Sequence, residues 1–125
     1  MLHKLVWLAL AGALGTLARY GAVGLVHRFA DSAFPWGTLS INVIGCFLAG
    51  LLWGLFEHRW PVHGDTRAIV FIGFLGALTT FSTFVLESGE FFRTAEWARA
   101  IGNILLQNGL GFTALFGGLA VSRVL

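Results

Sequence analysis

Polar and aromatic side chains interrupt the middle of one apolar segment, at residues 73–84 with the sequence GFLGALTTFSTF. Two glycines, Gly73 and Gly76, precede a run in which hydroxyl side chains alternate with phenylalanines. Backbone that leaves the helical conformation inside a bilayer must lie against protein or a polar cavity, because lipid offers no hydrogen bonds. Hydroxyls that merely join helices are the ordinary alternative. This density of polar groups instead favours a broken transmembrane helix of the kind found in transport proteins.

The aromatic rings of this segment could meet an anion without trapping it. The edge of an aromatic ring is positive, and conduction requires weak sites in succession. Phe81, Phe84 and Glu87 recur every three residues and share one stripe of a helix. Packing in a core or against lipid is the alternative for both rings. The hydroxyls of Ser82 and Thr83 between them favour an anion pathway.

Amide side chains occur in two other apolar segments. Asn42 is the only asparagine of its segment, and Gly45 follows three residues later. Asn103, Gln107 and Gly111 recur at four-residue steps, so they share one helix face. A buried amide must find partners, and a polar row facing lipid would be costly. These amides therefore either form hydrogen bonds between helices or face a permeating anion.

Backbone carbonyl groups near the predicted break could bind a cation. Gly76 and Thr79 bracket that break, and carbonyls that lose their helical partners must point at another group. Carbonyl oxygens suit a hard cation. Two symmetric chains would form a small oxygen cage on the twofold axis.

The composition is that of a membrane protein. Of 125 residues, 57% are apolar and 11% are charged, with a mean hydropathy of +0.81, whereas about a quarter of a soluble domain is charged. Four apolar segments approach or exceed the roughly 20 residues that cross a bilayer. They are residues 5–26, 38–56, 68–86 and 101–121. We predict an all-α integral membrane protein, one four-helix domain over residues 1–125, with its third helix broken at mid-span.

The charged and reactive residues exclude several functions. A net charge of +2 and a pI near 9.3 are too small and spread for nucleic-acid binding and better suit anionic lipid. No Ser-His-Asp, Cys-His or paired-carboxylate arrangement lies at membrane depth. We therefore expect that the protein is not an enzyme. Arg19 lies within the first segment. Its long side chain could reach the membrane surface or lend positive potential to an anion entrance.

Basic residues are balanced between the two sides of the predicted membrane domain. One side has Lys4, Arg59, Arg67 and Arg123, and the other has Arg28, Arg93 and Arg99, with Arg19 toward that side. The positive-inside rule therefore has no asymmetry on which to act. We infer that the chain can insert in both orientations and form an antiparallel homodimer.

Three motifs together resemble those of one family of membrane proteins. They are Gly12-x-x-Gly15-x-x-x-Arg19-Tyr20, Pro35-Trp36-Gly37-Thr38-Leu39-x-x-Asn42-x-x-Gly45, and the segment from Gly73 to Phe84 followed by Glu87. This combination resembles the CrcB/Fluc family of small fluoride channels. The resemblance covers essentially the whole chain, and the third motif is the most specific.

The resemblance implies a dual-topology, antiparallel homodimer in the bacterial cytoplasmic membrane that passively exports fluoride through two pores and reduces fluoride toxicity. By motif position it implies pore residues, vestibule residues and a structural sodium ion held by backbone carbonyls. The pore set is Asn42, Phe81, Ser82, Thr83 and Phe84 with Asn103 and Gln107 of the fourth helix, the vestibule set is Arg19 and Glu87, and the sodium set is Gly76 and Thr79. Gly111 departs from the family pattern because it has no side-chain donor.

A second class of small four-helix, dual-topology dimers is the multidrug exporters. These proteins need a membrane-embedded carboxylate to exchange protons for cationic drugs, and the sequence has no Asp or Glu at mid-span. A purely structural membrane subunit would leave the mid-span polar cluster without a role. The residues by themselves indicate a small anion, and the choice of fluoride over chloride rests on the resemblance.

Overall fold

The computed structural model describes residues 1–125, and its regular elements are all helices. Four helical stretches are long and apolar enough to cross a membrane: Leu2–Val26, Trp36–His58, Gly64–Arg93 and Trp97–Val124. The third of these consists of several shorter helices. The predicted all-helical, multi-pass membrane protein is therefore confirmed. So is the bend in the middle of its third membrane-crossing segment.

Short helical segments make up the third crossing. The elements in order are α1 (Leu2–Val26), α2 (Trp36–His58), α3 (Gly64–Ala68), the π-helix η1 (Ile69–Leu75), α4 (Gly76–Leu78), α5 (Phe81–Arg93) and α6 (Trp97–Val124). In η1 the turns are wider than in an α-helix, and the Gly76 N–H donates to the Phe71 carbonyl. Such wide turns are frequent near functional sites. Here the widened stretch leads directly into the break.

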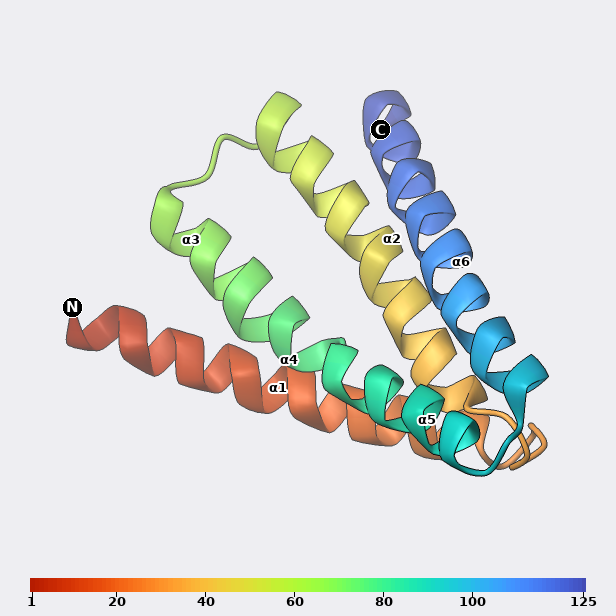
Figure 1. Ribbon diagram of the computed structural model, residues 1–125. Coiled ribbons are helices and arrows are strands. Elements are labelled where there is room, and N and C mark those ends of the chain that lie inside the picture. Colours follow the sequence, from red (N-terminus) through yellow and green to blue (C-terminus); the bar gives the residue numbers. More distant parts are fainter.

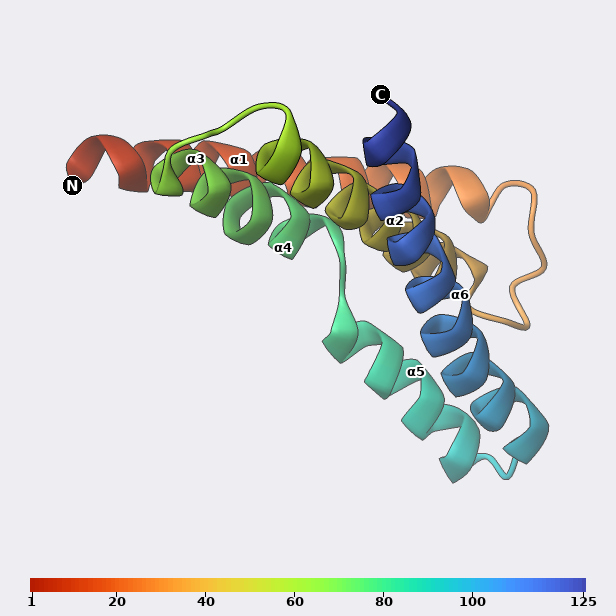
Figure 2. The same cartoon turned by 90° about the horizontal axis from the view of Figure 1, so that it is seen from above.

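The two halves of the third crossing pack against different neighbours. η1 and α4 lie against α1, whereas α5 lies against α6, and α2 and α6 pack together along much of their length (Figure 1). Figure 2 shows α5 turning out of the line of α3 and α4 after the break. The break therefore redirects the chain from α1 to α6, and it lies next to α2.

Glycines allow the helices to approach closely. A Cβ atom at Gly50, Gly54 or Gly118 would overlap atoms of the facing helix in the α2–α6 pair, and one at Gly15 would overlap the Phe74 carbonyl oxygen. Small residues serve helix packing in membranes because lipid provides little hydrophobic drive for helices to associate. These contacts fix the separation between α2 and α6, from which Asn42 and Gln107 project.

Adjacent glycines of α6 allow a matched test of this packing. Gly118→Ala should lower the free energy of unfolding by about 1–3 kcal/mol, because overpacking forces backbone shifts. The new methyl group would overlap the Phe47 carbonyl and lie 2.7 Å from the Leu51 nitrogen. Gly117→Ala is the control, since a Cβ there meets nothing within 4 Å. Thermal unfolding in detergent measures both variants, and equal losses would contradict the packing argument.

Candidate functional site

The third crossing loses its helical conformation at two threonines. Thr79 and Thr80 are extended, with φ/ψ of −88°/160° and −148°/103°. Gly76, predicted as one boundary of the break, is still helical at −62°/−33°. The Thr79 N–H and hydroxyl both bond the Leu75 carbonyl at 3.0 Å, which extends the helical turn to this residue. The break therefore begins at Thr79 and includes Thr80.

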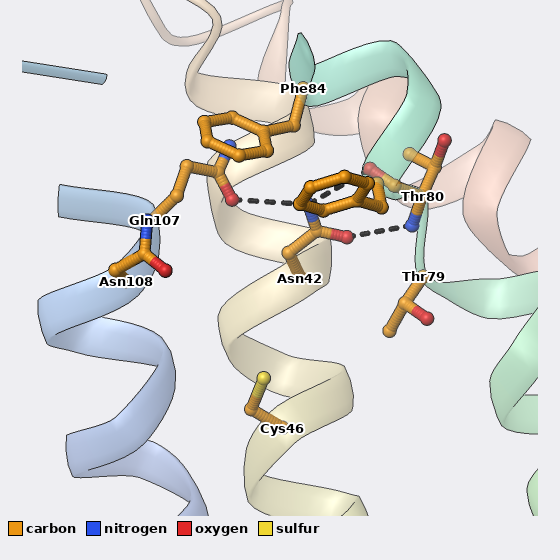
Figure 3. A pocket seen from close by; sticks show the side chains of 8 residues that line it. Asn42, Cys46, Thr79, Thr80, Phe84, Gln107 and Asn108 are labelled. Atoms are coloured by element: carbon orange, nitrogen blue, oxygen red, sulfur yellow. Dashed lines mark hydrogen bonds between the residues drawn. The ribbon is translucent and has the colours of Figure 1, made fainter. Parts of the chain in front are cut away.

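Asn42 of α2 replaces the hydrogen bonds that the break removes. Its Oδ1 accepts from the Thr80 N–H at 2.8 Å, and its Nδ2 donates to the Thr80 carbonyl at 3.2 Å (Figure 3). The same Nδ2 donates to Oε1 of Gln107 on α6 at 3.0 Å. One amide thus pairs both backbone groups of Thr80, much as a neighbouring strand would, and joins three helices at the break.

Two backbone carbonyls lose the donors that a continuous helix would supply. In an unbroken helix the Thr80 N–H would bond Gly76 and the Thr83 N–H would bond Thr79. Instead, the Thr83 N–H donates to the Thr80 hydroxyl oxygen at 3.3 Å and caps α5. The Thr79 carbonyl accepts from Arg19 Nη1 at 3.3 Å. The carbonyls predicted to bind a cation are thus released from those helical donors, and Arg19 binds one of them.

The first cavity at the break has a volume of about 210 Å³ and no charged side chain in its wall. Phe81 and Phe84 meet there edge to face, with ring centroids 5.5 Å apart. Gln107 also lines this cavity, and its Nε2 is buried without a hydrogen-bond partner. The lining residues are Asn42, Cys46, Thr79, Thr80, Phe81, Phe84, Gln107 and Asn108. Ring edges and an unused donor make this wall suited to a small anion.

A second cavity, of about 530 Å³, lies against α1 and carries charge. Arg19 and Glu87 both line it, together with Thr83. The Thr38 hydroxyl donates to Glu87 Oε1 at 2.6 Å, while Glu87 Oε2 is buried without a partner. Thr80 lines both cavities. The break therefore lies between a neutral cavity and a charged one.

The predicted site residues divide between these cavities, and three of them, Gly76, Ser82 and Asn103, fall outside both. Asn42, Phe81, Phe84 and Gln107 line the neutral cavity, and Arg19, Thr83 and Glu87 line the charged one. Ser82 is exposed and lines neither. Asn103 is fully buried, and its Nδ2 donates at 3.0 Å to Ser88 Oγ. In this chain Asn103 joins α6 to α5, and its role in a pore stays a prediction.

Several residues of the site did not stand out in the sequence. Thr80 belongs to the polar segment, but its pairing with Asn42 spans 38 positions and gives no local pattern. The Thr38–Glu87 bond spans 49 positions. Asn108 follows Gln107 directly and also lines the neutral cavity, so amide side chains on two neighbouring faces of α6 contribute to its wall. Cys46 lies one turn after Asn42 on α2, and that spacing could have placed it beside the cavity.

Comparison with known proteins gives consistent results. Residues 6–119 match the family model described as CrcB-like protein, Camphor Resistance (CrcB). A protein of Desulforapulum autotrophicum named fluoride-specific ion channel FluC is 56% identical over the full length of both chains. Proteins of the same name from Nitrosococcus oceani and Solidesulfovibrio magneticus are each 47% identical, again over the full length of both chains.

A double-mutant cycle can test the buried link between α5 and α6. Asn103→Ala and Ser88→Ala should each lower the free energy of unfolding by about 1–3 kcal/mol, because each removes a buried hydrogen bond. Ser88→Ala also leaves the Asn103 Nδ2 group without an acceptor, whereas in Asn103→Ala the Ser88 hydroxyl still donates to the Phe84 carbonyl. Together they should cost about 1 kcal/mol less than the sum. Asn108→Ala is the control and should stay within about 0.5 kcal/mol, since Asn108 is exposed and donates within its own helix, to Ile104. Strictly additive losses would contradict the link.

Proposed function

Because the chain belongs to the CrcB-like family, we propose that it is a fluoride-specific ion channel. The observation that carries this proposal is the neutral cavity beside the break, where Asn42 holds the backbone open next to Phe81 and Phe84. In this proposal fluoride moves passively along ring edges, amides and hydroxyls. The channel exports fluoride across the cytoplasmic membrane and so reduces its toxicity.

The chemistry of the cavity wall fits a weakly held anion. A fixed positive charge would bind fluoride tightly and slow its release, whereas conduction needs binding that is strong enough for access and weak enough for departure. The neutral cavity has no lysine, arginine or histidine. The amides of Asn42, Gln107 and Asn108 line this cavity, and Phe81 and Phe84 offer positive ring edges. The preference for fluoride is supported by the names of the relatives.

We also propose that two copies assemble as an antiparallel homodimer. Phe81 is 74% exposed although it lines the cavity, so the wall is open on one side in a single chain. In α1 only Gly15 is buried, which leaves a long apolar helix for lipid and a second copy to cover. The balanced basic residues support opposite orientations of the two chains. The second copy would complete each pathway.

A structural sodium ion fits the carbonyls at the break. Gly76 and Thr79 have lost the helical donors described above, and uncharged oxygens suit a hard monovalent cation. One chain supplies two such carbonyls, so a four-oxygen site requires both copies. A bound sodium ion would supply positive charge that holds the two breaks together. Gly76 and Thr79 would position its oxygen ligands, while Arg19 donates to one of the same oxygens.

The small multidrug and cation exporters remain the alternative because of Glu87. This carboxylate lies within α5, inside the third membrane-crossing segment, which was predicted to end at residue 86 but extends to Arg93. Its Oε2 is buried without a partner. The Thr38 hydroxyl, however, fixes the other oxygen. A channel and a proton-coupled exporter differ in whether fluoride flux occurs without a proton gradient.

Fluoride efflux from proteoliposomes at equal internal and external pH tests the channel. Fluoride should leave rapidly and chloride should not, and Phe81→Ile should slow the efflux about fivefold through loss of a ring edge worth roughly 1 kcal/mol. Phe116→Ile is the control, because Phe116 is also on the protein surface, 63% exposed, but lines neither cavity at the break. Equal chloride and fluoride fluxes, or flux only with a proton gradient, would refute the proposal.

Replacing sodium by N-methylglucamine tests the cation and the dimer together. Loss of the cation should leave facing carbonyls unpaired, so cross-linked dimer in detergent and the thermal midpoint should both fall, as should fluoride efflux. Potassium serves as a control for cation size. Unchanged dimer, midpoint and efflux in N-methylglucamine would remove the sodium site from the proposal while leaving the channel.

A further inference from the structure

An apolar groove runs between the first half of α1 and the π-helix η1. Its volume is about 290 Å³, and all seven residues that line it are apolar. They include Trp7, Leu10 and Leu14 from α1 and Ile69, Val70 and Phe74 from η1. The three α1 residues are exposed, so the groove is open along that helix. None of these residues lines either cavity at the break.

An ion pair lies at one end of the groove. Lys4 Nζ of α1 and Asp65 Oδ1 of α3 are 2.7 Å apart, and the two side chains are 41% and 67% exposed. Lys4 precedes Trp7 by three residues on α1. Asp65 precedes Ile69 by one turn, because the Ile69 N–H donates to the Asp65 carbonyl. On each wall a charged side chain therefore lies about one turn before a groove-lining residue, on the same helix face.

The groove has about the length of one leaflet of a membrane. Ten residues separate Lys4 from Leu14. They rise about 15 Å along a helix, and half of the hydrocarbon core is also about 15 Å thick. Trp7 lies near the charged end, and its Nε1 donates to His3 Nε2 at 2.9 Å. Tryptophans with a hydrogen-bonded indole are typical of the membrane surface. The other end of the groove, at Phe74, therefore lies near mid-membrane, shortly before the break.

We propose that this groove binds one acyl chain of a phospholipid whose headgroup carries a phosphate and a primary ammonium group, as in phosphatidylethanolamine. Lys4 donates to the phosphate, and the headgroup ammonium donates to Asp65. A headgroup with two opposite charges complements the exposed ion pair, whereas a purely anionic headgroup is repelled by Asp65. A primary ammonium has three hydrogen-bond donors, whereas the quaternary ammonium of phosphatidylcholine has none.

The position of the groove favours lipid over a second copy as its occupant. The proposed contact between two copies is centred on the break at Thr79, and the ion pair lies about the thickness of a leaflet from the inner end of the groove. A change from apolar wall to charged end over that length matches a lipid molecule. The walls belong to α1 and η1, so a bound chain adds contacts to the half of the third crossing that precedes the break. This inference does not depend on the proposed channel.

Quenching of Trp7 fluorescence by brominated lipid tests the groove in vesicles. A variant that keeps only Trp7 carries Trp36→Phe, Trp53→Phe, Trp60→Phe and Trp97→Phe. The vesicles are phosphatidylcholine in which a minor, fixed fraction of the lipid is brominated in the upper part of one acyl chain. That fraction is either phosphatidylethanolamine or phosphatidylcholine. Brominated phosphatidylethanolamine should quench Trp7 about two- to fivefold more strongly, which is the preference expected from one exposed charge pair.

The control is a variant that keeps only Trp97, which is 60% exposed at the start of α6 and does not line the groove. Both brominated lipids should quench Trp97 equally. Asp65→Asn in the Trp7 variant should remove the preference for phosphatidylethanolamine. Equal quenching of Trp7 by both lipids in the parent Trp7 variant would overturn the proposal. Strong quenching of Trp97 with little quenching of Trp7 would also overturn it, since a second copy would then cover the groove.

Native mass spectrometry of the protein with all its tryptophans provides a second measurement. Released from mixed micelles, the protein should retain phosphatidylethanolamine in preference to phosphatidylcholine by the same two- to fivefold. Asp65→Asn should abolish the preference, whereas Asp31→Asn should keep it, because Asp31 lies in the loop before α2 and does not pair with Lys4. An equal retention of both lipids by the unmodified protein would contradict the proposal. Fluoride efflux is measured separately, so these outcomes leave the proposed channel unaffected.

Discussion

The amide of Asn42 is the constraint on which the site depends. A helix that breaks inside a bilayer exposes backbone donors and acceptors to a medium that cannot satisfy them, at a cost of several kcal/mol for each group. Asn42 pairs the N–H and the carbonyl of Thr80 at once, at 2.8 and 3.2 Å. The side chain is held in turn by Gln107. Without a partner of this kind, the extended conformation at Thr79 and Thr80 would leave backbone groups without hydrogen bonds in hydrocarbon.

The close packing of α2 and α6 follows from the same constraint. Asn42 can reach Thr80 and Gln107 only if both neighbours approach α2, and glycines make this approach possible. Gly45 lies against the Thr79 side chain, and Gly50 and Gly118 lie against the backbone of the facing helix. These positions bind no ion themselves. They bring the helices close enough for the Asn42 amide to form hydrogen bonds with both Thr80 and Gln107.

The sequence predicted the parts of the structure that have a local signal. Long apolar segments predicted the four membrane crossings, and the glycines and hydroxyls of residues 73–84 predicted the bend within the third. That crossing was predicted to end at residue 86 but extends to Arg93, because the acidic side chains of Glu87 and Glu90 are not typical of a membrane-crossing segment. Glu87 is accommodated in α5 by Thr38, whose position 49 residues away no local pattern reveals. For Asn103, a hydrogen bond between helices was one of the two predicted alternatives, but its partner Ser88 gives no signal at helical spacing.

Arg19 connects the two proposals made for the break. A carbonyl oxygen has two lone pairs, so Thr79 can accept from Arg19 and still have one lone pair for a cation. A guanidinium at this point stabilises the released carbonyl in the single chain, before any second copy or ion is present. It also places a fixed positive charge in the charged cavity, which Glu87 lines as well. In the proposed channel this charge would attract an anion toward the break, while the neutral cavity on the other side of Thr80 would bind it weakly. The separation of a charged cavity from a neutral one follows from which side of one broken helix each residue occupies.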